Sequence, residues 1–256
     1  MTNFLQFKEL HYQINPLLIG NVWNVQSAKV YEKLNFKALG TSSAAIANSL
    51  GYEDGEQMPF SDLLFIVERI LKNIKLPLTV DIEFGYGKNA LEIAQNIITL
   101  NKIGVIGINI EDSFIENGTR KLKDYLQFSE LLNEIRSILH KNKIELFINV
   151  RCDAFLLNIE NAIQVATERI IEYENSGADG IFLPCIVDEI DILKIISLLN
   201  IPLNVMCMPN LPNFEKLEQL GVKRISMGNF FNNYIYTELE NKTSKVLNEQ
   251  SFTTLF

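Results

Sequence analysis

Short apolar runs alternate with longer amphipathic stretches along the whole chain. The runs have the length of β-strands, whereas the stretches between them place apolar residues three and four positions apart, as Ile163, Ala166 and Ile170 show. Several stretches end in Gly or Asn, for example at Gly177 and Asn200, which is a helix stop signal. We predict strands at residues 17–20, 38–40, 78–82, 105–110, 146–150, 180–183, 203–205 and 224–227, and helices at 61–73, 89–101, 129–142, 160–176, 188–199 and 213–220.

This alternation predicts an α/β protein. Parallel strands need crossover connections, so eight strand and helix units indicate a parallel sheet, and eight such units fit a closed (β/α)₈ barrel, the TIM barrel, better than an open sheet. The 256 residues match the roughly 250 that this barrel typically needs. Because no linker or repeat divides the chain, we expect one catalytic domain over residues 1–256.

Composition and charge narrow the class of partner. The formal net charge is −8 and no basic stripe is visible, which argues against nucleic acid. No apolar run approaches the roughly 18–20 residues of a membrane span, and the N-terminus has no secretory signal. Three scattered cysteines, Cys152, Cys185 and Cys207, are too few for a disulfide framework or a zinc site. We therefore expect a cytoplasmic protein with no membrane partner.

Acidic side chains gather where predicted strands end, which is where barrel enzymes carry their chemistry. Asp81 and Glu83 close the third strand two residues apart and are expected to point to one side of it. Glu111 follows the fourth strand, and Asp54 lies in the loop after the second strand and its helix. Converging carboxylates are costly without a cation, and hard oxygen ligands suit Mg²⁺. The alternative is that these acids cap helices or pair with lysines on the rim.

The predicted strand ends carry no histidine and, in the middle of the barrel, no lysine, which disfavours two kinds of catalysis. His11 lies near the N-terminus and His140 late in a predicted helix, so histidine acid–base catalysis is disfavoured. No lysine closes a strand in the middle of the barrel, which argues against a Schiff-base aldolase. Metal-assisted chemistry on an enolate remains.

Several segments, in order, resemble the isocitrate lyase/phosphoenolpyruvate mutase superfamily. Residues 80–87, VDIEFGYG, are similar to its metal-binding V-D-x-[DE]-x-G-Y-G run. Residues 107–113, GINIEDS, and 149–154, NVRCDA, resemble its E-D and N-A-R-T-D-A segments, and residues 41–56 resemble the segment that begins its substrate site. The resemblance covers about residues 15 to 230 and is closest to the phosphonomutase-like branch, also labelled carboxyvinyl-carboxyphosphonate phosphorylmutase-like.

The resemblance implies a Mg²⁺ site, with Mn²⁺ as a possible substitute, and a small anionic 2-oxo acid or phosphonate as substrate. It implies that Asp81 binds the metal directly. Arg151 is implied to stabilise an enolate or phosphoryl oxygen, although an ion pair with Asp153 or Glu111 is an alternative role. The further implied residues are Asp54, Glu83 and Glu111 for metal-bound waters, Thr41, Ser42 and Ser43 for the substrate carboxylate, and Trp23 for the pocket wall, with Asp54 and Arg151 as the catalytic pair.

One segment departs from the lyase branches. Their K-[KR]-C-G-H loop after the fourth strand corresponds here to residues 112–124, which contain neither Cys nor His. Isocitrate cleavage is therefore not expected. The hypotheses that remain are a lyase or mutase making or breaking a C–C or P–C bond beside a 2-oxo carboxylate, a phosphonopyruvate hydrolase, and a catalytically silent metabolite-binding barrel.

Two further segments carry expectations. Residues 112–128 form a long connection that bears Arg120, Lys121 and Lys123 and is expected to act as a mobile lid. Residues 228–248 are expected to form a helix with many apolar side chains. Because relatives exchange their last helix between subunits, the resemblance implies a homodimer or homotetramer built in this way.

Overall fold

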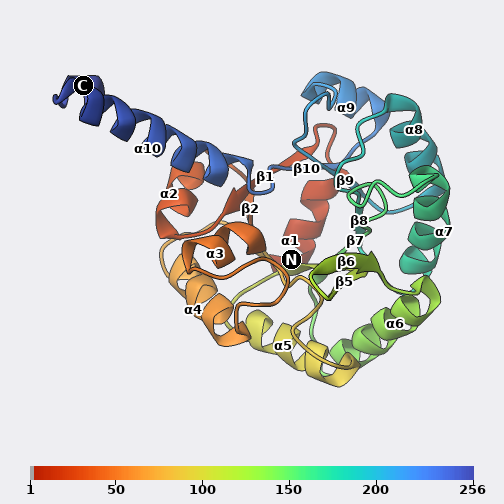
Figure 1. Cartoon of the computed structure of the whole chain (residues 1–256). Coiled ribbons are helices and arrows are strands. Elements are labelled where there is room, and N and C mark those ends of the chain that lie inside the picture. Colours follow the sequence, from red (N-terminus) through yellow and green to blue (C-terminus); the bar gives the residue numbers. More distant parts are fainter. Residues whose placement is uncertain (1–2) are drawn as a thin grey trace.

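A computed structural model describes residues 3–256 and shows eight parallel strands closed into a barrel, with helices around the outside (Figure 1). The strand order around the barrel is β1-β10-β9-β8-β7-β4-β3-β2, and every neighbouring pair is parallel. This confirms the predicted TIM barrel, and each predicted strand is present within two residues of its expected bounds. The strands are β1 (Leu17–Val22), β2 (Ala38–Thr41), β3 (Leu78–Asp81), β4 (Gly107–Glu111), β7 (Phe147–Arg151), β8 (Gly180–Phe182), β9 (Leu203–Met206) and β10 (Arg224–Ser226).

The predicted helices are also present, and three short ones were not expected. These are α1 (Asn3–Glu9), α2 (Val25–Lys33) and α3 (Ser43–Ser49). The helix α6 begins four residues earlier than predicted, where the Asp124 side chain accepts a hydrogen bond from the backbone N–H of Gln127. The remaining helices are α4 (Phe60–Leu71), α5 (Ala90–Lys102), α6 (Tyr125–Lys141), α7 (Ala162–Asn175), α8 (Glu189–Leu198), α9 (Phe214–Leu220) and α10 (Phe230–Glu249), with single 3₁₀ turns at Leu10–Tyr12 and Thr253–Leu255.

The long connection after β4 forms an antiparallel hairpin rather than an irregular loop. Its strands are β5 (Ser113–Glu116) and β6 (Thr119–Leu122), and they pair along their whole length. Asn117 and Gly118 at the tip both have positive φ, 51° and 74°. Asn-Gly is the dipeptide that favours a two-residue hairpin turn, so the sequence did contain a signal for this element. In Figure 1 the hairpin lies across one side of the barrel opening.

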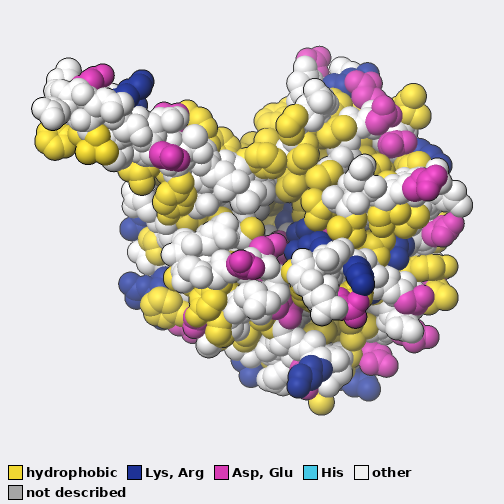
Figure 2. Space-filling view, in the orientation of Figure 1, with side chains coloured by type: hydrophobic (Ala, Val, Ile, Leu, Met, Phe, Trp, Pro, Cys, Tyr) yellow, Lys and Arg dark blue, Asp and Glu magenta, His cyan; other side chains and the backbone are white. Residues whose placement is uncertain are grey.

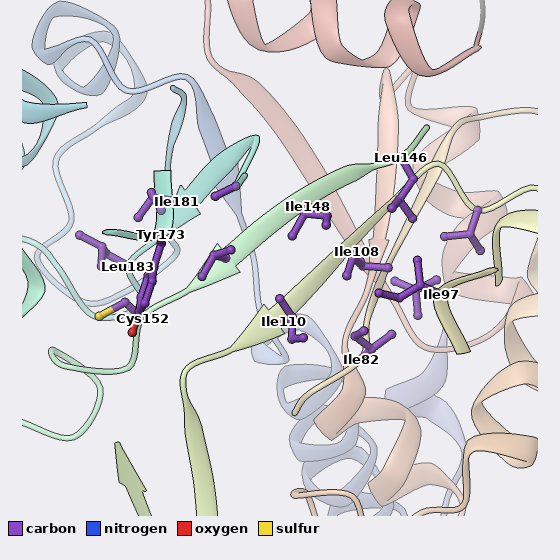
Figure 3. Packing of buried hydrophobic residues seen from close by; sticks show 14 of the residues in the cluster. Ile82, Ile97, Ile108, Ile110, Leu146, Ile148, Cys152, Tyr173, Ile181 and Leu183 are labelled. Atoms are coloured by element: carbon purple, nitrogen blue, oxygen red, sulfur yellow. The ribbon is translucent and has the colours of Figure 1, made fainter. Parts of the chain in front are cut away.

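The main core lies between the outer face of the barrel and the surrounding helices. Figure 3 shows Ile108 and Ile110 of β4 and Ile148 of β7 with Ile97 of α5. All four are almost completely buried. Burial of an isoleucine side chain contributes about 1.5–3 kcal/mol, so this layer supplies much of the stability that holds the strand ends in place.

The N-terminal end of the barrel is closed by the first helix and the turn after it. Phe7 of α1 lies edge-on to Phe147 of β7, with ring centroids 5.6 Å apart, and His11 stacks on the same ring at 4.3 Å. All three side chains are buried. We call these three residues the aromatic plug. Because the plug closes this end, the opening of the barrel is at the C-terminal ends of the strands.

The last helix, α10, projects away from the barrel (Figure 1). Its apolar side chains, including Phe231, Ile235 and Leu239, are exposed in the single chain. Exchange of this helix between subunits stays a prediction. None of the helices in residues 3–256 is long and apolar enough to cross a membrane.

Candidate active site

Asp81 is the last residue of β3 and faces the barrel opening with little exposure. Its backbone N–H donates to Thr41 Oγ1 over 2.9 Å, and its Oδ1 accepts the backbone N–H of Glu83 over 3.0 Å. Burial raises the pKa of Asp81 above its ordinary value, and the nearby Arg151 only partly opposes this. A fixed, buried carboxylate of this kind gains from a cation.

Glu83 is placed differently from the sequence expectation. The strand ends at Asp81, and Glu83 adopts a left-handed conformation with φ of 49°, so strand alternation does not set its direction. One carboxylate oxygen accepts the backbone N–H of Glu56 at 2.6 Å and the other accepts the Tyr86 hydroxyl at 2.9 Å. Burial, followed by the charges of Asp54 and Asp81, raises the pKa of Glu83 to about 7.

Glu111 ends β4 and is held through both of its carboxylate oxygens. Its Oε1 accepts Arg151 Nη1 at 2.7 Å, and its Oε2 accepts Arg120 Nη1 and, at 3.3 Å, the Ser113 hydroxyl. Burial raises the pKa of Glu111 to about 8 against the opposing charge of Arg151. Two guanidinium groups therefore share one carboxylate, which fixes its orientation toward the opening.

Arg151 ends β7 and pairs with both of the acids named as its alternative partners. Its Nε and Nη2 donate to the two oxygens of Asp153 at 2.6 and 3.3 Å, and Nη1 donates to Glu111. Three of the five guanidinium N–H groups are used, which leaves two for a ligand. Ion pairing therefore orients Arg151 and does not exclude the catalytic role.

Arg120 reaches into the site from strand β6 of the hairpin. Its Nη2 donates to Asp54 Oδ2 at 3.1 Å, and its Nη1 donates to Ser113 Oγ at 3.0 Å and to Asp153 Oδ2 at 3.4 Å, in addition to Glu111. Sequence reasoning had assigned Arg120 to a lid over the substrate. The structure instead pairs it with the acids themselves, and lid mobility stays a prediction. The second Asp54 oxygen, Oδ1, is buried and has no partner.

One cavity of about 220 Å³ at the barrel opening is lined by Asp54, Asp81, Arg120 and Arg151, whereas Glu83 and Glu111 lie outside its lining. Figure 2 shows the hollow, with Lys and Arg side chains visible inside it. Trp23 lies instead in an apolar groove beside α10, and Thr41 lies beneath Asp81. The predicted site residues that line the cavity are Ser42, Ser43, Asp54, Asp81 and Arg151.

The floor of the cavity contains polar residues that sequence reasoning missed. They include Asn21 of β1, Asn109 of β4, and Arg224 and Ser226 of β10. Each is next to a buried apolar residue of the same strand, namely Val22, Ile108 or Ile225. A polar residue at an inward position of a barrel strand was the available signal.

The donor set is compatible with a hard cation held mostly through water. No group of three His, Cys, Asp or Glu side chains among residues 3–256 is close enough to hold a metal ion directly. Mg²⁺ commonly takes one or two direct carboxylates and keeps several waters. Asp81 lines the cavity and could supply the direct carboxylate, and the unpartnered Oδ1 of Asp54, which also lines the cavity, could hold a metal-bound water.

Comparisons with known proteins agree with this arrangement. The family model described as phosphoenolpyruvate phosphomutase matches residues 7–247. An oxaloacetate decarboxylase of Pseudomonas entomophila is 31% identical over 228 residues, which cover 87% of this chain and 77% of that protein. The crystal structure of a putative phosphonomutase from Burkholderia cenocepacia J2315 superposes with a TM-score of 0.85 at 32% identity, covering 96% of this chain and 98% of that one. A phosphonopyruvate hydrolase solved with oxalate and Mg²⁺ has the same fold, with a TM-score of 0.85 at 19% identity over 99% of this chain and 89% of that one. The chain belongs to the phosphoenolpyruvate phosphomutase family and is an enzyme of its lyase and mutase class.

Proposed function

We propose that this enzyme is a Mg²⁺-dependent lyase that cleaves a C–C bond beside the carbonyl of a small 2-oxo carboxylate such as oxaloacetate. The observation that carries the proposal is the convergence of Asp54, Asp81 and Arg151 on one cavity of about 220 Å³, with Arg151 held by Glu111 behind it. The cavity is large enough for a small acid. The 31% identity to an oxaloacetate decarboxylase supports C–C cleavage.

The metal would be held by Asp81 directly, with Asp54, Glu83 and Glu111 holding its waters. When bound, the cation supplies positive charge for the substrate carboxylate and the adjacent carbonyl oxygen. The raised pKa values of Asp81, Glu83 and Glu111 support this assignment, because a nearby cation would favour their ionised forms. Mn²⁺ is expected to substitute for Mg²⁺.

The substrate carboxylate would be oriented at the start of α3. The backbone N–H of Ser42 already donates to the carbonyl of Val22 at 3.0 Å, so it is not free for a ligand. The Ser42 hydroxyl accepts the N–H of Ala45 and retains its own proton for donation. Ser42 would therefore contribute its hydroxyl, and Ser43, which also lines the cavity, would contribute the second contact.

Arg151 would stabilise the charge that develops during cleavage. When the bond between C3 and the departing carboxylate breaks, its electron pair forms the C2–C3 double bond and negative charge develops on the C2 oxygen. The two N–H groups of Arg151 that are not used by Glu111 and Asp153 are available for that oxygen. Because the two acids fix the guanidinium beforehand, it does not need to reorganise during the reaction.

A substrate panel tests the proposal. The full chain is assayed with oxaloacetate, other 2-oxo acids and phosphonopyruvate, each with Mg²⁺ and with a chelator. We expect pyruvate and CO₂ from oxaloacetate in Mg²⁺ only. Phosphate release from phosphonopyruvate instead would assign the hydrolase activity. Failure of every substrate in Mg²⁺ would support the silent barrel and contradict the proposal.

We further propose that α10 packs against a second subunit. Phe231, Ile235 and Tyr236 border an apolar groove that also includes Trp23 and Tyr31. Exposed apolar surface of this extent is rare on a monomer. Light scattering of the wild type is expected to show a dimer or tetramer. Ile235→Asp should shift the population toward monomer. A wild-type monomer at micromolar concentration would contradict the proposed assembly.

A further inference from the structure

Arg224 lies inside the barrel beneath the proposed active site. It is the first residue of β10 and only 2% exposed. Its Nη2 has two long contacts, 3.4 Å to Thr79 Oγ1 and 3.5 Å to Asn109 Oδ1. Its Nε and Nη1 are buried and have no hydrogen-bond partner. Most of this guanidinium is therefore unsatisfied.

No acidic side chain in the described part of the chain forms an ion pair with Arg224. The nearest ionisable neighbours do not compensate for this. Burial, followed by the charge of Arg224, lowers the pKa of His11 to about 3, so His11 is neutral. Burial lowers the pKa of Arg224 itself to about 9, and the charge of Asp81 opposes that shift without an ion pair between the two side chains. At neutral pH Arg224 remains charged without a counterion.

The other buried arginines of the molecule show how unusual this is. Arg120 and Arg151 each contact carboxylates of Glu111 and Asp153, and Arg169 contacts Asp112. A buried charge without a partner is strongly unfavourable for folding. Arg224 therefore carries a cost that the other three arginines do not, and a ligand anion could offset it.

The position of Arg224 gives a ligand access to it. Arg224 lines the same cavity as Ser42, Asp81 and Arg151. Gly40 of β2 lines the same cavity, and a Cβ added there would lie 3.0 Å from Ile19 Cγ2 and 3.1 Å from Thr79 Oγ1. The lining of this one cavity includes both Asp81 and the Arg224 guanidinium.

We propose that Arg224 is a specificity-determining residue that binds the second anionic group of the substrate, so the enzyme selects dianionic 2-oxo acids over monoanionic ones. The inference rests on the proposed function, which places the 2-oxo carboxylate at the opposite end of the cavity. A four-carbon dicarboxylate has charge at both ends, so its 2-oxo carboxylate would lie at Ser42 and Ser43 and its second carboxylate at Arg224.

Calorimetry of the full chain in saturating Mg²⁺ tests this with three ligands. The first, 3,3-difluorooxaloacetate, is a four-carbon dianion, the second, 2-oxobutyrate, has a methyl group in place of the second carboxylate, and the third, oxalate, engages only the metal end. We expect the wild type to bind the dianion at least roughly 30-fold tighter than 2-oxobutyrate. Arg224→Gln should abolish that preference and change oxalate affinity less than about threefold, and Arg224→Lys should keep part of the preference.

Stability measurements separate a binding role from a structural one. If the guanidinium lacks a counterion, Arg224→Gln should leave the Tm unchanged or raise it. A second variant, Asn109→Asp, puts a carboxylate where Asn109 Oδ1 already faces Arg224, so it should raise the Tm and weaken dianion binding as Arg224→Gln does. Because this variant retains Arg224, it decides the question even if Arg224→Gln does not fold.

The two hypotheses fail in different ways. If the wild type does not bind oxalate in Mg²⁺, the proposed function is wrong. If oxalate binds but Arg224→Gln and Asn109→Asp weaken the dianion no more than 2-oxobutyrate, the proposed function stands and the role of Arg224 in specificity is overturned.

Discussion

The two ends of the barrel bury different kinds of side chain. At the N-terminal end Phe7, His11 and Phe147 pack as an aromatic plug without a charged group among them. At the C-terminal end the buried groups are charged, and Glu111 and Arg151 are at their centre. Apolar burial stabilises the fold, whereas buried ion pairs contribute little or even oppose stability. The plug therefore adds to the stability of the fold, whereas the charged end serves the proposed function.

The pKa shifts at the two ends also give opposite dependences on pH. Burial raises the pKa of Glu83 to about 7 and of Glu111 to about 8, so the folded chain without metal loses stability as pH rises above the ordinary glutamate pKa of about 4.5 toward those values. Burial lowers the pKa of His11 to about 3. The contribution of His11 to the free energy of unfolding is therefore complete above about pH 6.5 and falls as the pH drops toward 3. Burial disfavours the charged form of every group. It therefore raises the pKa of an acid and lowers the pKa of a base, and the two ends respond to pH in opposite directions.

The largest effect should come from removing Asp81, the acid proposed to bind the metal directly. Asp81→Ala is expected to lower turnover roughly 1,000-fold or more, since a metal-stabilised charge contributes several kcal/mol to the transition state. Its Tm should not fall, because the change relieves repulsion among neighbouring carboxylates. Steady-state kinetics with thermal unfolding measures both.

A matched aspartate away from the opening serves as the control. Asp179 accepts Arg136 Nη2 at 2.6 Å and the backbone N–H of Ile148 at 3.1 Å. Asp179→Ala should lower the Tm while activity of the folded fraction stays near wild type. Comparable activity losses in the two variants would contradict the division between the ends.

Arg151→Ala should have the next largest effect. We expect turnover to fall about 100-fold, as for the loss of one group that stabilises developing negative charge. Arg169 provides the comparison, because it donates to Asp112 Oδ2 and the Tyr173 hydroxyl outside the cavity lining. Arg169→Ala should mainly reduce stability. If turnover by folded Arg151→Ala is unchanged, Arg151 has only a structural role.

The smallest predicted effect lies in the aromatic plug. Between pH 6.5 and 4.5 the wild type should lose about 1.4 kcal/mol of unfolding free energy per pH unit relative to His11→Asn, because protons bind His11 only in the unfolded chain. Denaturant unfolding at several pH values measures this difference. His140→Asn changes the other histidine, which is exposed on α6, and should track the wild type. If His11→Asn and the wild type show the same pH dependence, the plug is not a neutral, closed structure.

The sequence predicted the barrel well because its strands are continuous apolar runs. It allowed Asp81, Glu83 and Glu111 to be singled out because each closes a predicted strand, whereas Asp54 lies in a loop, and the metal-binding roles of all four stay a prediction. It could not predict that Arg120 would pair with Asp54 and Glu111, because that contact depends on the hairpin folding back over the opening. Nothing in the sequence indicated that Arg224 lacks a counterion, because the side chains around its guanidinium come from strands that are distant in the sequence. The spacing of apolar residues predicts helices and strands, but it does not predict contacts that form only when the barrel closes.

The central claim is that the charged end is a metal-dependent site for an enolate-like ligand, and titration of oxalate tests it most directly. Oxalate presents two adjacent carboxylates without being able to react, so it should gain from the cation and from Arg151 together. Calorimetry with the full chain, with a protein-free Mg²⁺ blank, is expected to show binding in Mg²⁺, none in chelator, and none for Asp81→Ala. Equal binding with and without Mg²⁺, or no binding in either condition, would contradict the account.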